Sequence, residues 1–136
     1  MNVSSLLATA ALVGALSATA CSGPTPMKAS AASPFSEGTV DASYKLGGNG
    51  SVKVRVKNLG DASKIAKEAT IYVVWLTPEN GAPQNAGALK VDGDMEGELE
   101  FTTSFKKFHI TVTPEPSAEA ASKSGTPVLE ADVVAD

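Results

Sequence analysis

The most constraining feature of this sequence is an apolar run of seven residues, Ile71 to Thr77, which holds the only tryptophan, Trp75. Its side chains are mostly β-branched or aromatic, and residues 77–81 (TPENG) follow as a turn-forming sequence. A short run of this composition, ended by turn residues, is typical of a buried β-strand. Because both alternating sets of side chains are apolar, we expect a central strand that is covered on both faces, with Trp75 in the core.

Other segments alternate apolar and polar residues with a period of two, as half-buried strands do. The clearest is 51–57, where three valines alternate with Lys53, Arg55 and Lys57. Further strands are expected over residues 39–46, 85–91, 95–101, 108–113 and 128–134, with a hairpin turn at Asp92-Gly93, and a turn or two of helix over 61–69. Six or seven short antiparallel strands predict an all-β fold, an immunoglobulin-like β-sandwich.

The N-terminus predicts export. Residues 3–20 carry no charge, and small residues lead up to the single cysteine, Cys21. A run of this kind that ends in small residues favours a signal peptide over a membrane span. Residues 16–21 (LSATAC) resemble a bacterial lipobox, although Ala18 stands where leucine is usual and no basic residue precedes the run, which suggests a start codon further upstream. The alternative is an ordinary secretory peptide with an incidental thiol.

The lipobox resemblance implies that Cys21 carries diacylglycerol and begins the mature protein. Two or more acyl chains anchor a protein stably to a membrane, whereas one holds it only marginally. Ser22 stands where a retention signal would have aspartate, which implies the periplasmic face of the outer membrane in a two-membrane bacterium. We expect residues 21–37 to be a flexible tether, because they are rich in Ser, Ala and Pro, and residues 38–136 to form the domain.

Composition and motifs exclude several functions. A net charge of -4 with scattered basic residues, and 5% aromatic residues, argue against nucleic-acid binding. The acidic residues Asp92, Asp94, Glu96, Glu98 and Glu100 depart from the calcium-loop pattern and are interpreted as a solvated strand face. His109 has no histidine or cysteine partner in the sequence pattern and is interpreted as a surface residue. We therefore expect no catalytic residue, no metal site and no cofactor.

Several segments in order resemble a known family. They are residues 72–76 (YVVWL), a loop with Gly and Pro, 86–89 (AGAL), 108–116 (FHITVTPEP) and 125–129 (GTPVL). Together they resemble the C-terminal extracytoplasmic domain of anti-sigma-K factors, although Thr113 interrupts the Val-Glu-Pro of that family and the double glycine after it is absent. The resemblance implies an external module without the sigma-binding domain, so no direct sigma-factor binding is expected.

These observations predict a non-enzymatic, lipid-anchored envelope protein whose sandwich binds a protein or senses an envelope component. Its partners would be the membrane, through lipid on Cys21, and an envelope protein. Two alternatives stay open: a periplasmic hydrolase that uses paired carboxylates, and a structural surface lipoprotein without a specific ligand. Convergent carboxylates in one concave pocket would favour the hydrolase, and an exposed apolar patch would favour the binding module.

Overall fold

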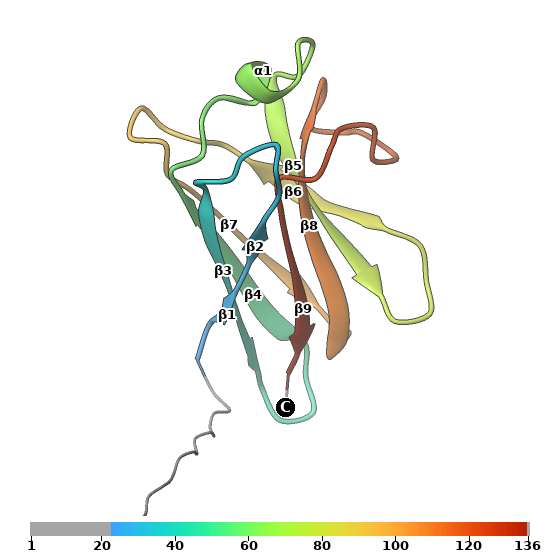
Figure 1. The fold of residues 1–136 in the computed structure, drawn as a ribbon. Helices are drawn as coiled ribbons and strands as arrows, with labels where there is room; N and C mark the ends of the chain where they lie inside the picture. The colour runs from blue at the N-terminus through green and yellow to red at the C-terminus, as the bar shows by residue number, and fades with distance from the viewer. Residues whose placement is uncertain (1–22, 136) are drawn as a thin grey trace, which may run out of the picture.

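The computed structural model describes residues 23–135, and these form two antiparallel sheets packed face to face (Figure 1). The first sheet has the order β1 (Thr25–Pro26), β3 (Glu37–Tyr44), β4 (Gly50–Lys57) and β7 (Gly97–Thr103). The second has the order β2 (Lys28–Ala29), β9 (Leu129–Val134), β8 (Lys107–Glu115), β5 (Ile71–Pro78) and β6 (Gln84–Leu89). The predicted all-β sandwich is confirmed. The predicted signal peptide and Cys21 lie outside the described residues.

Strand β5 is the central strand that its composition predicts. It pairs with β8 on one side and β6 on the other. Tyr72, Val74 and Leu76 face the other sheet and belong to the main hydrophobic core. Val73 and Trp75 point to the opposite, outer face and are nevertheless fully buried. The outer face of β5 is therefore covered, as expected for a strand that is apolar on both sides.

The core between the sheets is built from the alternating apolar residues of four further strands. The inward-facing set is almost fully buried: Val40 from β3; Val52, Val54 and Val56 from β4; Phe108, Ile110 and Val112 from β8; Leu129, Ala131 and Val133 from β9. The basic residues of β4 lie on the other face of the same strand, as predicted. A single helical turn, α1 (Ala62–Ile65), closes one end of the sandwich (Figure 1).

The prediction of a flexible tether over residues 21–37 is wrong for its larger part. Strand β1 pairs with β3 through Thr25 opposite Val40, and β2 pairs with β9 through Lys28 opposite Glu130. Between the two strands, the Met27 side chain is 9% exposed and packs into the core. The chain therefore crosses from one sheet to the other at Met27. Main-chain pairing and one buried side chain offset the ordering cost that the composition suggested.

The predicted hairpin around Asp92-Gly93 is only partly present. The turn forms, with the Asp92 N–H donating to the Glu96 carbonyl over 2.8 Å and a bridge joining Val91 to Gly97. Beyond that bridge the flanking strands separate, because β6 pairs with β5 in one sheet and β7 pairs with β4 in the other. The connection is thus a crossover between the sheets and not a two-stranded hairpin.

Candidate functional site

The outer face of β8 collects the polar groups of the second sheet. His109, Thr111, Thr113 and Glu115 alternate with the inward-facing apolar residues and so share this face. The neighbouring strand β9 adds Glu130 opposite Thr111, and Asp132 opposite His109. Exposure falls along the strand, from the half-buried His109 to the fully buried Glu115.

His109 lies between two carboxylates of β9. Its Nδ1 is 2.8 Å from Asp132 Oδ1, and its Nε2 is 2.9 Å from Glu130 Oε1. Burial alone would lower the pKa of His109, but the hydrogen bonds and negative charges of Asp132 and Glu130 outweigh it, so the pKa is raised above its ordinary value of 6.5. Because a neutral imidazole has only one N–H, two acceptors favour the imidazolium form, which donates to both.

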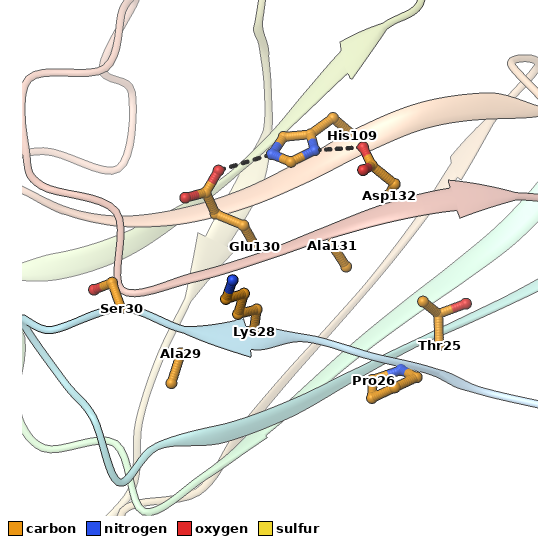
Figure 2. Close-up of a pocket in the computed structure, with 9 residues that line it drawn as sticks. All are labelled: Thr25, Pro26, Lys28, Ala29, Ser30, His109, Glu130, Ala131 and Asp132. Carbon is orange, nitrogen blue, oxygen red and sulfur yellow. Dashed lines mark hydrogen bonds and ion pairs between the residues drawn. The ribbon is translucent and has the colours of Figure 1, made fainter.

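These three side chains border an open hollow of about 580 Å³ (Figure 2). Figure 2 shows β9 beside the chain at Lys28 and Ala29, and the two separating towards Thr25 and Pro26. Beyond Glu130, no strand among residues 23–135 pairs with this side of β9. The hollow therefore lies along an unpaired strand edge, with charged side chains on one wall and Ala29 and Ala131 among its lining residues.

The hydrogen bonds within the cluster occupy both ring nitrogens of His109. Both ring nitrogens of His109 face carboxylates, so neither has a lone pair directed into the hollow. No hydroxyl or thiol among the described residues bonds to the ring, so it forms no Ser–His or Cys–His pair. Within residues 23–135, no three His, Cys, Asp or Glu side chains are arranged to hold a metal ion.

A second polar cluster lies at the other end of β8 and has a structural role. Thr113 Oγ1 accepts from Trp75 Nε1 over 2.8 Å and donates to Glu115 Oε2 over 2.6 Å. The Ser124 and Gly125 N–H groups and the Ser124 hydroxyl also donate to Glu115. Burial acts to raise the pKa of Glu115, but the hydrogen bonds from Ser124, Thr113 and Gly125 outweigh it, so the pKa is lowered.

This buried carboxylate holds the loop of residues 117–125 against the sheet. On the other side of β5, Asn85 Nδ2 donates to the carbonyls of Ala118 and Ala120. A Cβ on Gly125 would lie 2.1 Å from the Pro114 carbonyl oxygen, so only glycine allows the loop this close to β8. The loop is thus attached on both sides of β5, which accounts for the burial of Trp75 on the outer face.

The acidic residues of 92–100 do not converge on a common point. Asp92 Oδ1 accepts from the N–H groups of Asp94 and Glu96 within its own turn. Glu98 pairs with Arg55 over 3.1 Å, and Glu100 accepts from Ser51. The interpretation as a strand face holds for Glu98 and Glu100, whose carboxylates pair with side chains of β4, whereas Asp92, Asp94 and Glu96 belong to the turn before β7.

Sequence reasoning placed His109 on the outer face but missed its carboxylate partners. The same alternation puts Glu130 and Asp132 outward on the last strand, so the signal was present in the pattern. What the pattern lacked was the pairing of β8 with β9 and its register, which sets Asp132 opposite His109. Cys21, the predicted lipid attachment residue, lies outside the described residues.

Comparison with protein families, with curated proteins and with solved structures finds no match for this chain. The resemblance to anti-sigma-K factors therefore stays a prediction from sequence motifs. Among the helices of residues 23–135, none has the length and apolar character needed to cross a membrane.

Proposed function

We propose that the protein is a lipid-anchored protein of the bacterial cell envelope whose β-sandwich binds an extended segment of another protein. The observation that supports this proposal is the unpaired edge of β9 beside the hollow at His109. An exposed edge offers main-chain donors and acceptors to an added strand, and nearby side chains then select the sequence of that strand. On this proposal the module binds or senses a partner and catalyses no reaction.

The backbone of β9 supports this mode of binding. The Ala135 N–H donates to the Lys106 carbonyl on the β8 side over 2.8 Å. In an antiparallel strand the N–H and C=O of one residue point to the same side, and successive residues alternate. The main-chain groups of Val134 and Asp132 therefore point away from β8, towards the unpaired edge, where an incoming strand would find them.

The side chains at this edge indicate the chemistry of the partner. Asp132 is 88% exposed and lies on the outer face next to the edge. Its carboxylate bonds to one ring nitrogen of His109. Glu130, two residues earlier on the same strand, bonds to the other ring nitrogen. We expect the bound segment to place a lysine or arginine over Asp132, because a cation there would pair with a carboxylate at the rim of the hollow.

Site-directed photocrosslinking in intact cells tests this binding surface. A benzophenone amino acid replaces Lys28, which lines the hollow, and in a matched protein it replaces Lys67, which is exposed near α1 at the other end of the sandwich. We expect a defined protein adduct from position 28 alone, and its loss when Asp132→Lys reverses the charge at the edge. Equal adducts from both positions, or an adduct that Asp132→Lys leaves unchanged, would contradict the proposal.

The anchor is tested separately by labelling cells with radioactive palmitate. The proposal rests on the lipobox-like sequence that ends at Cys21 and on the uncharged run before it. Label should enter the wild-type protein and should be absent from Cys21→Ala, because the thiol is the attachment point. Equal incorporation into both proteins would remove the anchor from the proposal and leave the binding surface to be judged on its own.

A further inference from the structure

One end of the sandwich is formed by three chain segments that are bonded together. They are the β3–β4 turn, the β7–β8 turn and the end of β9, at the opposite end from α1 (Figure 1). The Tyr44 hydroxyl donates to the Phe105 carbonyl, and the Ala135 N–H donates to the Lys106 carbonyl. These bonds join β3, the β7–β8 turn and β9 into one surface, which we call the distal end.

Three of the five large hydrophobic side chains that are exposed among the described residues lie at this distal end. Leu46 is fully exposed, Val134 is 69% exposed and Phe105 is 37% exposed. Lys45 precedes Leu46 in the sequence, and Lys106 follows Phe105. The next residue, Lys107, pairs with Glu79 over 3.1 Å. Apolar side chains among lysines are the composition that membrane-surface segments use.

The other end of the sandwich exposes lysines too, Lys64 and Lys67 near α1, but there the exposed hydrophobic residues lie beside carboxylates. Its exposed Met95 lies in a turn with three acidic residues, Asp92, Asp94 and Glu96. Phe35, the remaining exposed hydrophobic residue, is two residues from Glu37, where β3 begins. An anionic membrane surface repels carboxylates, and the two distal turns, residues 45–49 and 104–106, contain lysines but no acidic residue, which favours the distal end.

The first described strand points towards the same end of the sandwich. Strand β1 runs antiparallel to β3 with Thr25 opposite Val40, so its N-terminal end points towards Tyr44. Cys21 precedes Thr25 by four positions in the sequence, and Tyr44 follows Val40 by four positions. A four-residue segment spans at most about 14 Å. A lipid on Cys21 therefore has reach to the distal end, and little beyond it.

We infer that the distal end rests on the lipid bilayer, with Leu46 and Phe105 among the headgroups and Lys45 and Lys106 facing anionic lipid. This inference rests on the proposed lipid anchor. It fixes the orientation of the domain. In this orientation α1 points away from the membrane, and the unpaired edge of β9 runs roughly perpendicular to the membrane surface. A partner segment bound to this edge would then lie along the membrane normal, parallel to the axis of β9.

Accessibility of spin labels in the lipidated full-length protein tests this orientation. Because the thioether consumes the thiol of Cys21, the only cysteine, a cysteine introduced by Asn49→Cys in the β3–β4 turn or by Lys67→Cys near α1 is the sole labelling site. Each protein is incorporated into vesicles of three parts phosphatidylcholine and one part phosphatidylglycerol. We expect accessibility to a water-soluble nickel chelate to be several-fold lower at position 49 than at position 67.

Two further measurements keep the outcomes distinct. Leu46→Ser combined with Phe105→Ser should raise nickel accessibility at position 49, and so should replacing the anionic lipid with phosphatidylcholine. Co-sedimentation with vesicles reports the anchor itself. A protein that sediments with vesicles while positions 49 and 67 are equally accessible would overturn the orientation and leave the anchor intact. A protein that stays in solution would overturn the proposed lipid anchor.

Discussion

The two ends of the outer face of β8 hold polar clusters that differ in burial and in the charge of their partners. At one end Glu115 is fully buried and accepts hydrogen bonds from uncharged groups on Thr113, Ser124 and Gly125. At the other end His109 is partly exposed and is held by two carboxylates. The first arrangement stabilises one loop conformation, because a buried carboxylate is costly unless it accepts hydrogen bonds. The second leaves charge at the surface, where a ligand can reach it.

Only the exposed polar groups on this face are available for recognition. A buried carboxylate with satisfied partners is costly to disturb and offers nothing to a ligand. A surface cluster contributes little to stability, since water screens its charges, and is therefore free to serve binding. Between them lies Thr111, whose buried hydroxyl finds no hydrogen-bond partner among the described residues.

The largest expected effect comes from removing the side chain that the buried cluster covers. Trp75→Ala deletes a fully buried indole and its hydrogen bond to Thr113. Truncation of large aromatic residues in protein cores costs about 3 to 5 kcal/mol. We expect this loss in the free energy of unfolding, measured by urea denaturation. Trp75→Phe, which keeps a ring but lacks the N–H, should cost less, and an unchanged melting temperature in Trp75→Ala would refute the assignment of β5 as a central, covered strand.

The next largest effect is expected from Glu115 itself. Glu115→Ala leaves the donors of Thr113, Ser124 and Gly125 without an acceptor, and hydrogen bonds to charged groups contribute about 1.5 to 3 kcal/mol. We expect a loss of about that size, with the loop of residues 117–125 losing protection from hydrogen exchange first. Glu115→Gln keeps one acceptor oxygen and serves as the milder control. A loop that stays protected in Glu115→Ala would contradict the role given to this carboxylate.

The buried cluster should also make stability depend on acid. The pKa of Glu115 is lowered from its ordinary value of 4.5 in the folded protein, so its contribution is present above pH 4.5. That contribution is lost as pH falls below 4.5, through the lowered pKa, because protonation removes an acceptor from the loop. The difference in unfolding free energy between wild type and Glu115→Gln should therefore shrink below pH 4.5. A difference that stays constant from pH 6 to pH 3 would count against this linkage.

The surface cluster should give the smallest effect on stability and a clear effect on titration. His109 is the only histidine, so its ring proton signals in an NMR titration need no assignment. We expect a pKa above 6.5 in the wild type, falling towards 6.5 in Asp132→Asn and in Glu130→Gln, with Glu98→Gln as a control that leaves it unchanged. High salt should reduce the shift, because these charges are partly exposed.

The contribution of His109 to stability changes with pH in the opposite direction to that of Glu115. A histidine with a raised pKa contributes stability below pH 6.5, and this is lost as pH rises through the raised value. Since exposed ion pairs contribute about 0.2 to 1 kcal/mol, the effect on unfolding should be at most of that order. A pKa of His109 at or below 6.5 in the wild type would show that the carboxylates do not hold the ring in solution.

Much of the fold followed from local patterns, while the site did not. Alternation placed Val52, Val54 and Val56 inside and His109 outside, because side-chain direction in a strand depends only on sequence parity. It could not show that Asp132 lies opposite His109, because register is a relation between two strands. The prediction for residues 21–37 failed for the same reason: pairing with β3 and β9 orders a segment whose own composition suggests disorder.

The sequence by itself determined the all-β class, the buried central strand with Trp75, and the inward and outward faces of most strands. The leader that ends at Cys21 stays a prediction from sequence. Only the tertiary structure decided that β6 and β7 belong to different sheets, and that the chain crosses between sheets at Met27. It also decided that His109 sits between two acids beside an unpaired edge. The physical reason is that periodicity and composition act over a few neighbouring residues, whereas pairing, register and burial depend on segments that meet only when the chain has folded.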